Sequence, residues 1–421
     1  MEDGAFSALQ RGFTVPVRDP LWGHIYLTEG LKALTVSAPF MRLSRILQLG
    51  PTFCVYPGAT HTRASHSIGV YNLARRLLIS LWEKGATWLS KEGALSFLCA
   101  ALLHDLGHFP YTHSLKELAL EDHEKLSARI ILSEPLKSLV SKAGADPELA
   151  AAIIDKGEKK PQAGLKQPGE LEFYRRLLSG VLDPDKLDYL TRDARYCGVP
   201  YGAQDVDFIY SRLYPHRERG VEIDSRGIPS VESILFSKYL MYRTVYWHHQ
   251  VRSATAMIKK ALLGALENRI IVPEELYNLD DQGLFSLMAA RQKDFPGFSA
   301  AGKVREGDFF KEIGSFMFDG QKHQFPIEKR GAQEAALAEE ISRYTGEEVT
   351  AGSIIIDVPE PFSFETDLFV RDENCTFAES SSSLKKSAAE AFVQALRKVR
   401  VFSEKKLDIP GNILQNYKYD V

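Results

Sequence analysis

Apolar residues recur along most of this chain at the spacing of an α-helix rather than that of a strand. Residues 94–103 are almost entirely apolar and predict a buried helix, whereas residues 66–83 place apolar side chains mainly on one face and predict a long amphipathic helix. Further helices are predicted at residues 39–49, 114–120, 123–132, 146–156 and 170–181. Another helix is predicted to begin after the N-cap Asp183, and residues 230–268 predict one long helix or a pair of helices.

Strand-like segments are short and lie near the two ends of the sequence. Residues 1–20 are irregular in pattern, residues 24–27 predict a short strand, and the polar, Gly- and Pro-rich residues 157–169 predict a mobile loop. After residue 270, a helical segment at 270–300 precedes strands at 353–358, 367–370 and 399–402 and helices at 331–344 and 383–398. We therefore predict a mainly α protein, with an all-helical core at residues 1–268 and a smaller C-terminal α+β region at residues 269–421.

A group of polar residues follows the buried helix. His104, Asp105, His108 and His113 lie within ten residues, and imidazole and carboxylate groups are ligands for divalent cations. His108 lies four residues after His104 and shares its face if the helix continues. The alternative is a helix end whose histidines cap carbonyl groups and contact solvent.

Another histidine, His66, lies in the first turn of the helix at 66–83, three residues after Arg63. The free N–H groups of a helix N-terminus attract anions. A metal ligand and an arginine at such an end predict a site for a metal-bound phosphate, and the alternative is a surface histidine beside a surface arginine.

The helix after Asp183 carries a continuous polar face. Asp185, Asp188, Tyr189 and Arg192 follow one another at helical spacing, and such a face can simply be solvated. Asp188 and Arg192, however, pair well at a spacing of four residues. That pair leaves Asp185 and Tyr189 to face a site.

Together these segments predict metal-assisted hydrolysis of a phosphate ester. Two imidazoles and two carboxylates from three helices can hold one cation, which lowers the pKa of a bound water. Other histidines would act as acids or phosphate donors, and basic residues would stabilise the charge that develops in phosphoryl transfer. The residues concerned are the metal ligands His66, His104, Asp105 and Asp185, the histidines His108, His113 and His123, and the cations Arg63 and Lys186.

Composition narrows the class of protein. The 421 residues are 44% hydrophobic and 25% charged, as in soluble globular proteins. A net charge of −3 and a pI of about 6.4 argue against a protein that binds nucleic acid through bulk charge. The four cysteines form no CxxC motif, and neither a signal segment nor an apolar run of membrane-spanning length is present, so we expect a cytoplasmic protein with reduced thiols and no membrane partner.

Five motifs resemble those of the HD-domain metal-dependent phosphohydrolases, in particular their deoxynucleoside triphosphate (dNTP) triphosphohydrolase branch. That branch includes the vertebrate sterile-alpha-motif/HD dNTPase and its bacterial relatives, and the likeness covers about residues 12–270. The motifs are DPLWGHI (19–25), QLGPTFCVYPGATHTRASHSIGV (48–70), HDLGHFPYTH (104–113), DPDKLDYLTRD (183–193) and YLMYRTVYWHH (239–249).

The resemblance implies an all-α HD-domain core in which water attacks the α-phosphorus of a dNTP and releases the deoxynucleoside and inorganic triphosphate. It implies one divalent ion on the four metal ligands, Mg or Mn first, with Fe, Zn, Ni or Co as alternatives. His113 would be the acid toward the 5′-oxygen, with His108, His123 and Asp105 near it. The implied phosphate contacts are Arg63, Lys186 and Tyr189, and Lys238 stands near the phosphates where the relatives have an arginine. The implied sugar contacts are Gln48, Leu49 and Asp193, and Tyr246 would be the wall that excludes ribose.

The resemblance also sets expectations for regulation and assembly. It implies a homo-oligomer, tetramer or dimer, with a nucleotide activator at a subunit interface, and we expect no sterile-alpha-motif domain before the core. Ser44 and Val36 stand where the nucleotide-activated vertebrate member has a basic and an acidic residue, so activation by dGTP at that same site is not expected. The alternatives are another HD nucleotide phosphohydrolase, such as a 5′-nucleotidase or cyclic-nucleotide phosphodiesterase, and a nucleotide-binding regulator with weak activity.

Overall fold

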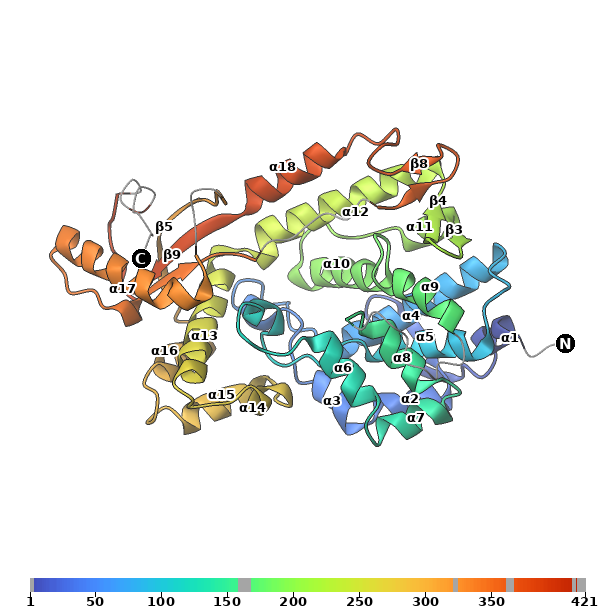
Figure 1. Ribbon diagram of the computed structural model, residues 1–421, viewed down its shortest axis with the longest axis horizontal. Helices are drawn as coiled ribbons and strands as arrows, with labels where there is room; N and C mark the ends of the chain where they lie inside the picture. The colour runs from blue at the N-terminus through green and yellow to red at the C-terminus, as the bar shows by residue number, and fades with distance from the viewer. Residues whose placement is uncertain (1–3, 158–167, 321–324, 361–366, 411–413, 415–421) are drawn as a thin grey trace.

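The computed structural model describes residues 4–157, 168–320, 325–360, 367–410 and 414. The fold is mainly helical, as the hydrophobic spacing predicts (Figure 1). The α-helices are α1 (Ala5–Gln10), α2 (Glu29–Thr35), α3 (Ala38–Leu43), α4 (Arg63–Glu83), α5 (Lys91–Leu103), α6 (His123–Ile131), α7 (Leu136–Lys142), α8 (Pro147–Ile154), α9 (Pro168–Leu178), α10 (Pro184–Cys197), α11 (Val206–Arg212), α12 (Ile228–Met241), α13 (His249–Glu267), α14 (Glu274–Tyr277), α15 (Asp281–Ala290), α16 (Phe298–Glu306), α17 (Ile327–Thr345) and α18 (Lys386–Leu396).

Helix α4 packs against both α5 and α10 at the centre of the molecule. Helix α5 is buried on every side from Gly93 to Leu103, as its continuous apolar run predicts. Helices α4 and α10 meet at Gly69, where a Cβ atom would lie 2.0 Å from Asp188 Oδ1. The missing side chain at Gly69 therefore lets the polar face of α10 approach α4.

Helix α10 begins and ends where its sequence predicts. Asp183 caps its first turn by accepting a hydrogen bond from the backbone N–H of Lys186, and Pro184 follows the cap. Gly198 ends the helix with a φ of 68°, a left-handed conformation that glycine adopts without strain. These two signals fix where α10 begins and ends.

Helices α12 and α13 are joined by a π-helical turn, η4 (Tyr242–Tyr246). Figure 1 shows α12 and α18 side by side, and Phe392 of α18 stacks on Tyr239 of α12 with ring centroids 4.6 Å apart. A π-helical turn shifts the helical register locally. Here the turn places Tyr242 and Tyr246 on the wall of the cavity described below.

Strands form three small sheets among the described residues. The hairpin β1-β2 stands alone, the second sheet has the order β3-β4-β7-β8, and the third has the order β5-β9-β6. The strands are β1 (Val15–Asp19), β2 (Gly23–Leu27), β3 (Leu213–His216), β4 (Gly220–Ile223), β5 (Lys311–Met317), β6 (Ile354–Asp357), β7 (Phe369–Val370), β8 (Cys375–Thr376) and β9 (Lys398–Ser403).

The second sheet joins the two predicted regions. Strand β4 pairs in parallel with β7, with Glu222 opposite Phe369. The predicted boundary at residue 268 follows the end of α13 at Glu267, yet later strands return to the core. The region after residue 269 is therefore attached through a shared sheet as well as through the chain.

Several predicted elements differ from those observed. The segment predicted as irregular at residues 1–20 contains α1 and β1. The helix predicted at residues 39–49 ends at Leu43, and the one predicted at 114–120 is a short 3₁₀ helix, η2 (Thr112–Leu115). Most of the predicted mobile loop at residues 157–169 lies outside the described residues. None of the described helices combines the length and the apolar character that crossing a bilayer requires.

Candidate metal centre and active-site cavity

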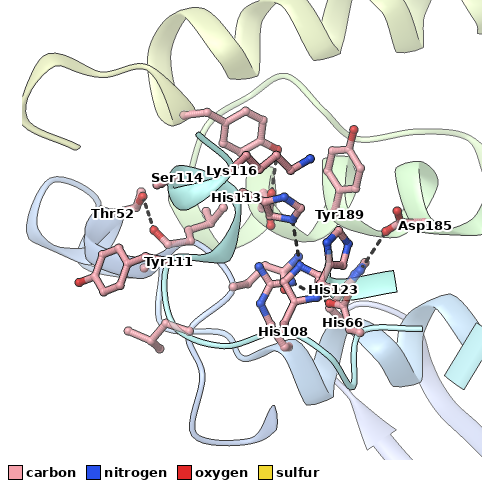
Figure 2. Close-up of a pocket in the computed structure, with 18 of the residues that line it drawn as sticks. Thr52, His66, His108, Tyr111, His113, Ser114, Lys116, His123, Asp185 and Tyr189 are labelled. Carbon is pink, nitrogen blue, oxygen red and sulfur yellow. Dashed lines mark hydrogen bonds and ion pairs between the residues drawn. The ribbon is translucent and has the colours of Figure 1, made fainter. Parts of the chain in front are cut away.

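A cavity of about 480 Å³ opens where α4, α10 and the segment after α5 meet (Figure 2). Most residues predicted to form a site line this cavity, although they come from segments far apart in the sequence. The predicted residues that line it are Gln48, Leu49, Arg63, His66, His104, Asp105, His108, His113, His123, Asp185, Tyr189, Asp193 and Tyr246. Lys186 and Lys238 are not among its described lining residues.

The predicted metal ligands lie together on one side of the cavity. Donor atoms of His66, His104 and Asp105 all lie within 4.8 Å of one another. Asp185 lies outside that set but against it, because its Oδ1 is 3.0 Å from His66 Nε2 and 3.8 Å from His104 Nε2. The structure therefore brings the predicted ligands of three segments to one place.

Hydrogen bonds orient both imidazole rings for metal binding. His104 Nδ1 lies 2.9 Å from the carbonyl oxygen of Ala101, whereas its buried Nε2 makes no hydrogen bond and lies 3.2 Å from Asp105 Oδ1. When Nδ1 donates its proton to a carbonyl, Nε2 carries a free lone pair, which is what a metal ligand needs. The donor set therefore fits a divalent cation.

The ring of His66 is held by a carboxylate that the sequence did not assign to the site. His66 Nδ1 lies 2.8 Å from Asp188 Oδ2. The predicted partner Arg192 donates to both oxygens of Asp188, at 2.8 and 2.9 Å, and the indole N–H of Trp22 donates to Oδ1 at 2.5 Å. The predicted Asp188–Arg192 pair is confirmed, and its further role is to orient His66 toward Asp185.

The charges of this centre are tightly balanced. Burial lowers the pKa of His66, but Asp185 and Asp188 outweigh burial and raise that pKa to about 10. Burial raises the pKa of Asp185, but His66 outweighs it and brings that pKa to about 2. Asp185 and Asp188 thus stabilise the protonated form of His66. A divalent cation bound beside the ring would supply the same positive charge in place of the proton.

Three further histidines form a cluster beside Asp105, and His108 is the member that contacts it. His108 Nδ1 lies 3.1 Å from Asp105 Oδ1, and His108 Nε2 lies 3.1 Å from His113 Nε2. The rings of His108 and His123 are 4.1 Å apart. Desolvation at the cavity wall and the charge of Arg63 lower the pKa of both His108 and His113 well below the usual range. Burial lowers the pKa of His123 to about 4, so these rings are neutral at pH 7 in the substrate-free chain.

The predicted phosphate cations have different positions. Arg63 lines the cavity and donates to Asp105 Oδ2 at 2.8 Å, while its buried Nε has no partner. Lys186 instead directs its ammonium group to Asp183 Oδ2 at 2.8 Å and to the carbonyl oxygen of Gly180 at 2.9 Å. The N-cap carboxylate of its own helix thus competes for Lys186, which the helical spacing did not predict.

The opposite part of the cavity carries the predicted sugar contacts. Tyr246 donates to Asp193 Oδ2 at 2.7 Å, and His61 Nε2 lies 2.8 Å from Asp193 Oδ1. Gln48 has a buried side-chain oxygen without a partner. His61 is a site residue that the sequence interpretation missed, because its partner lies 132 residues away.

Several other lining residues were not predicted. Lys116, Lys156, Arg252 and Glu360 contribute charges to the cavity wall. Lys116 follows His113 by three residues, and this spacing is the one signal that could have identified it. Arg252 and Glu360 come from α13 and from the end of β6, and nothing local in the sequence connects them to the histidines.

The helical fold and the histidine–carboxylate centre define a class of metal-binding helical domains built on a His–Asp doublet. Residues 63–193 match the HD domain, and residues 212–404 match the HD associated region. The chain contains an HD domain followed by an HD associated region, and the predicted resemblance to HD-domain proteins is confirmed.

The chain is also similar to individual proteins and to a solved structure. The chain is 36% identical over 248 residues to YwfO of Bacillus subtilis, covering 58% of this chain and 54% of that protein. It is 28% identical over 276 residues to the human deoxynucleoside triphosphate triphosphohydrolase SAMHD1, covering 59% of this chain and 44% of that protein. The crystal structure of a phosphohydrolase from Bacteroides thetaiotaomicron aligns over 93% of this chain and 99% of that chain, with a TM-score of 0.70 and 25% identity. The chain spans about half the length of the curated relatives that it matches.

Proposed function

We propose that the chain is a metal-dependent phosphohydrolase that converts dNTPs to the deoxynucleoside and inorganic triphosphate. The observation that carries this proposal is the close grouping of His66, His104, Asp105 and Asp185 in a cavity that three further histidines also line. The relation to a named dNTP triphosphohydrolase supports the choice of substrate.

His66, His104, Asp105 and Asp185 would hold the divalent cation. When bound there, the cation supplies positive charge to phosphate oxygens and lowers the pKa of water at the α-phosphorus. Arg63 keeps Asp105 ionised and in place through their 2.8 Å hydrogen bond. These residues orient the phosphate and stabilise the negative charge that develops on it.

His113 would deliver the proton that the leaving 5′-oxygen needs. Its pKa is low in the substrate-free chain because of burial and the charge of Arg63. A bound phosphate anion offsets the charge of Arg63 and raises the pKa of His113 toward the range of a working acid. His108, 3.1 Å away, connects this ring to Asp105.

The opposite part of the cavity suits a deoxyribose. Gln48 has an unpartnered buried oxygen that can accept a hydrogen bond from the 3′-hydroxyl group. Asp193 is already held at both oxygens by His61 and Tyr246, so its position is fixed before substrate binds. The Tyr246 ring would then exclude a 2′-hydroxyl group from this rigid wall.

Product analysis tests the reaction. Each dNTP is incubated with the protein and Mg²⁺ or Mn²⁺, and the products are separated by ion-exchange chromatography. We expect deoxynucleoside and inorganic triphosphate, with the activity lost on chelation and restored by metal. Release of nucleoside monophosphate or free phosphate as the first product would refute the proposal.

A specific observation favours a second candidate, hydrolysis of a nucleoside monophosphate or cyclic nucleotide. Lys186 and Lys238, the cations expected beside a triphosphate, are not among the described lining residues. A substrate with one phosphate would need fewer cations. Activity on deoxynucleoside monophosphates in the absence of dNTP hydrolysis would support this candidate.

We also propose that the chain acts as a homo-oligomer with a nucleotide activator between subunits. Val36 and Ser44 are both exposed and uncharged. These two residues offer no ion pair to an activating nucleotide, so dGTP would have to bind through other residues. Analytical ultracentrifugation with and without dGTP measures whether the nucleotide changes the assembly state.

A further inference from the structure

Lys116 is a cation on the wall of the cavity that the predicted site did not include. It follows the 3₁₀ helix η2, three residues after His113. Side chains at this spacing in a 3₁₀ helix eclipse one another, and Figure 2 shows Lys116 beside His113. The charge of Lys116 contributes to the low pKa of both His113 and His123, which agrees with this proximity.

The other cations of the cavity wall are already paired. Arg63 donates to Asp105, and Arg252 donates to both oxygens of Asp357 at 2.6 and 2.8 Å. Lys156 lies 3.6 Å from Glu124. Among the lining residues that the structure describes, Lys116 is the cation with no carboxylate within ion-pair distance.

The exposed ammonium group of Lys116 has no carboxylate partner and is therefore available to a ligand. Lysine binds phosphate as a compact point charge with three donors on a flexible stem. Because its stem is long, the ammonium group can follow an anion into the cavity mouth. The ammonium group of Lys186 is hydrogen-bonded to Asp183. Of the predicted phosphate-binding cations, Arg63 is therefore the one that lines the cavity.

We infer, on the basis of the proposed function, that Lys116 binds the phosphate chain of the substrate and contributes the cation that Lys186 does not. The ligand class is a polyphosphate anion, either the triphosphate of a dNTP or inorganic triphosphate. Lys116 thereby favours a substrate with several phosphates over a monophosphate. This role is one of binding, and the proton transfers remain with the histidines.

Calorimetric titration of the manganese-loaded full chain with inorganic triphosphate tests this inference without requiring turnover. Lys116→Ala should weaken triphosphate binding about tenfold, since one charge-assisted contact is lost. Lys116→Arg keeps the charge and should stay within about threefold of the wild type. Lys137→Ala is the matched control, because it removes an exposed lysine that is paired with Glu148 outside the described cavity lining, and it should leave binding near the wild-type value.

Two further measurements separate a phosphate contact from a structural role. Lys116→Ala should raise the KM for dNTPs with kcat largely retained, and it should leave the affinity for the deoxynucleoside unchanged. Unchanged triphosphate affinity in Lys116→Ala overturns the inference, as does an equal loss of deoxynucleoside affinity or a wild-type chain that does not bind triphosphate.

The outcomes also distinguish this inference from the proposed reaction. Triphosphate binding that depends on Lys116 in a chain that hydrolyses no dNTP would retain the inference and refute the reaction. If the chain hydrolyses dNTPs but Lys116→Ala binds triphosphate as tightly as the wild type, the proposed reaction stands and the inference about Lys116 is refuted.

Discussion

His66 meets the metal centre through Nε2, while its Nδ1 lies 2.8 Å from Asp188. Asp188 is completely buried and receives hydrogen bonds from Arg192 and Trp22. Outer carboxylates of this kind fix the tautomer and the orientation of a ligating histidine. The position of His66 is therefore set by residues that lie outside the candidate metal-binding cluster.

Asp188→Asn is expected to weaken metal binding about 10- to 100-fold, because the amide replaces the charge that orients His66. Metal affinity can be measured by competition with a chromophoric chelator. Asp207→Asn changes a carboxylate that is 90% exposed and should leave the affinity unchanged. Equal affinities of Asp188→Asn and the wild type would contradict this account of the site.

Tyr246→Phe is expected to raise the KM for dNTPs about three- to tenfold, because Asp193 loses one of the two hydrogen bonds that fix it. Discrimination between dNTP and rNTP should also weaken. Tyr56→Phe removes a hydroxyl group that donates to the backbone of Thr244, outside the cavity lining, and serves as the control. Unaltered kinetics in Tyr246→Phe would show that Asp193 does not depend on this contact.

Local spacing predicted part of this site. The His–Asp doublet and the Asp188–Arg192 pair could be identified because their members are neighbours in sequence or on one helix turn. The partnership of His61 with Asp193 could not, because it forms only when two distant segments meet. Lys186 was assigned to phosphate from its charge and from the family resemblance, and its pairing with Asp183, three residues earlier, was not foreseen.

Helix α6 carries His123 and packs directly on the segment that follows α5. A Cβ atom at Gly107 would lie 2.1 Å from the carbonyl oxygen of His123 and 2.6 Å from Leu126 Cβ. The backbone N–H of Gly107 donates to Ser127 Oγ at 2.8 Å. The glycine between Asp105 and His108 is thus the point at which α6 reaches the site.

Gly107→Ala is expected to destabilise the chain by at least about 2 kcal/mol, because backbone atoms of α6 must move away. The change should be measured by chemical denaturation, together with metal affinity. Gly331→Ala lies in α17 with nothing within 4 Å of the new methyl group, and it should be neutral or slightly stabilising. Equal stability of Gly107→Ala and the wild type would contradict the close packing of α6.

Sequence periodicity predicted the long elements better than the short ones. The interiors of α4 and α5 follow from their apolar positions, and the ends of α10 follow from the Asp183 cap and Gly198. The strand predicted at residues 24–27 is present as β2, whereas its partner β1 and the strands β3 and β4 were missed, because short strands are stabilised by pairing partners that local spacing does not reveal. The helix expected at 39–49 stops at Leu43, which leaves Gln48 and Leu49 free to line the cavity.

At the scale of the whole molecule, a buried ion pair joins the core to the C-terminal region. Arg252 of α13 donates to Asp357 of β6 through two hydrogen bonds, and Arg252 also lines the cavity. Burial raises the pKa of Asp357, but the charge of Arg252 outweighs it and holds that pKa below its usual value. The C-terminal region therefore supports one wall of the cavity.

Asp357→Asn is expected to cost about 3 kcal/mol of the free energy of unfolding at pH 7, because Arg252 loses its main partner. A carboxyl group with a lowered folded-state pKa stabilises the fold above its unfolded pKa of about 3.9, and this stabilisation is lost as the pH falls through the folded-state pKa. The difference between wild type and variant should therefore shrink below about pH 4.

Urea unfolding across that pH range measures the difference. Asp308→Asn is the control, since it removes an exposed carboxylate paired with Lys311 and should change stability by less than about 0.5 kcal/mol. A difference between Asp357→Asn and the wild type that is constant from pH 7 to pH 3 would contradict the charged pair.

The central claim is that water attacks the α-phosphorus and that the bond to the 5′-oxygen breaks. Hydrolysis of a dNTP in ¹⁸O-labelled water, followed by mass spectrometry of both products, tests it most directly. The account predicts one ¹⁸O atom in inorganic triphosphate and none in the deoxynucleoside. Label in a nucleoside monophosphate, in free phosphate or in the deoxynucleoside would contradict it.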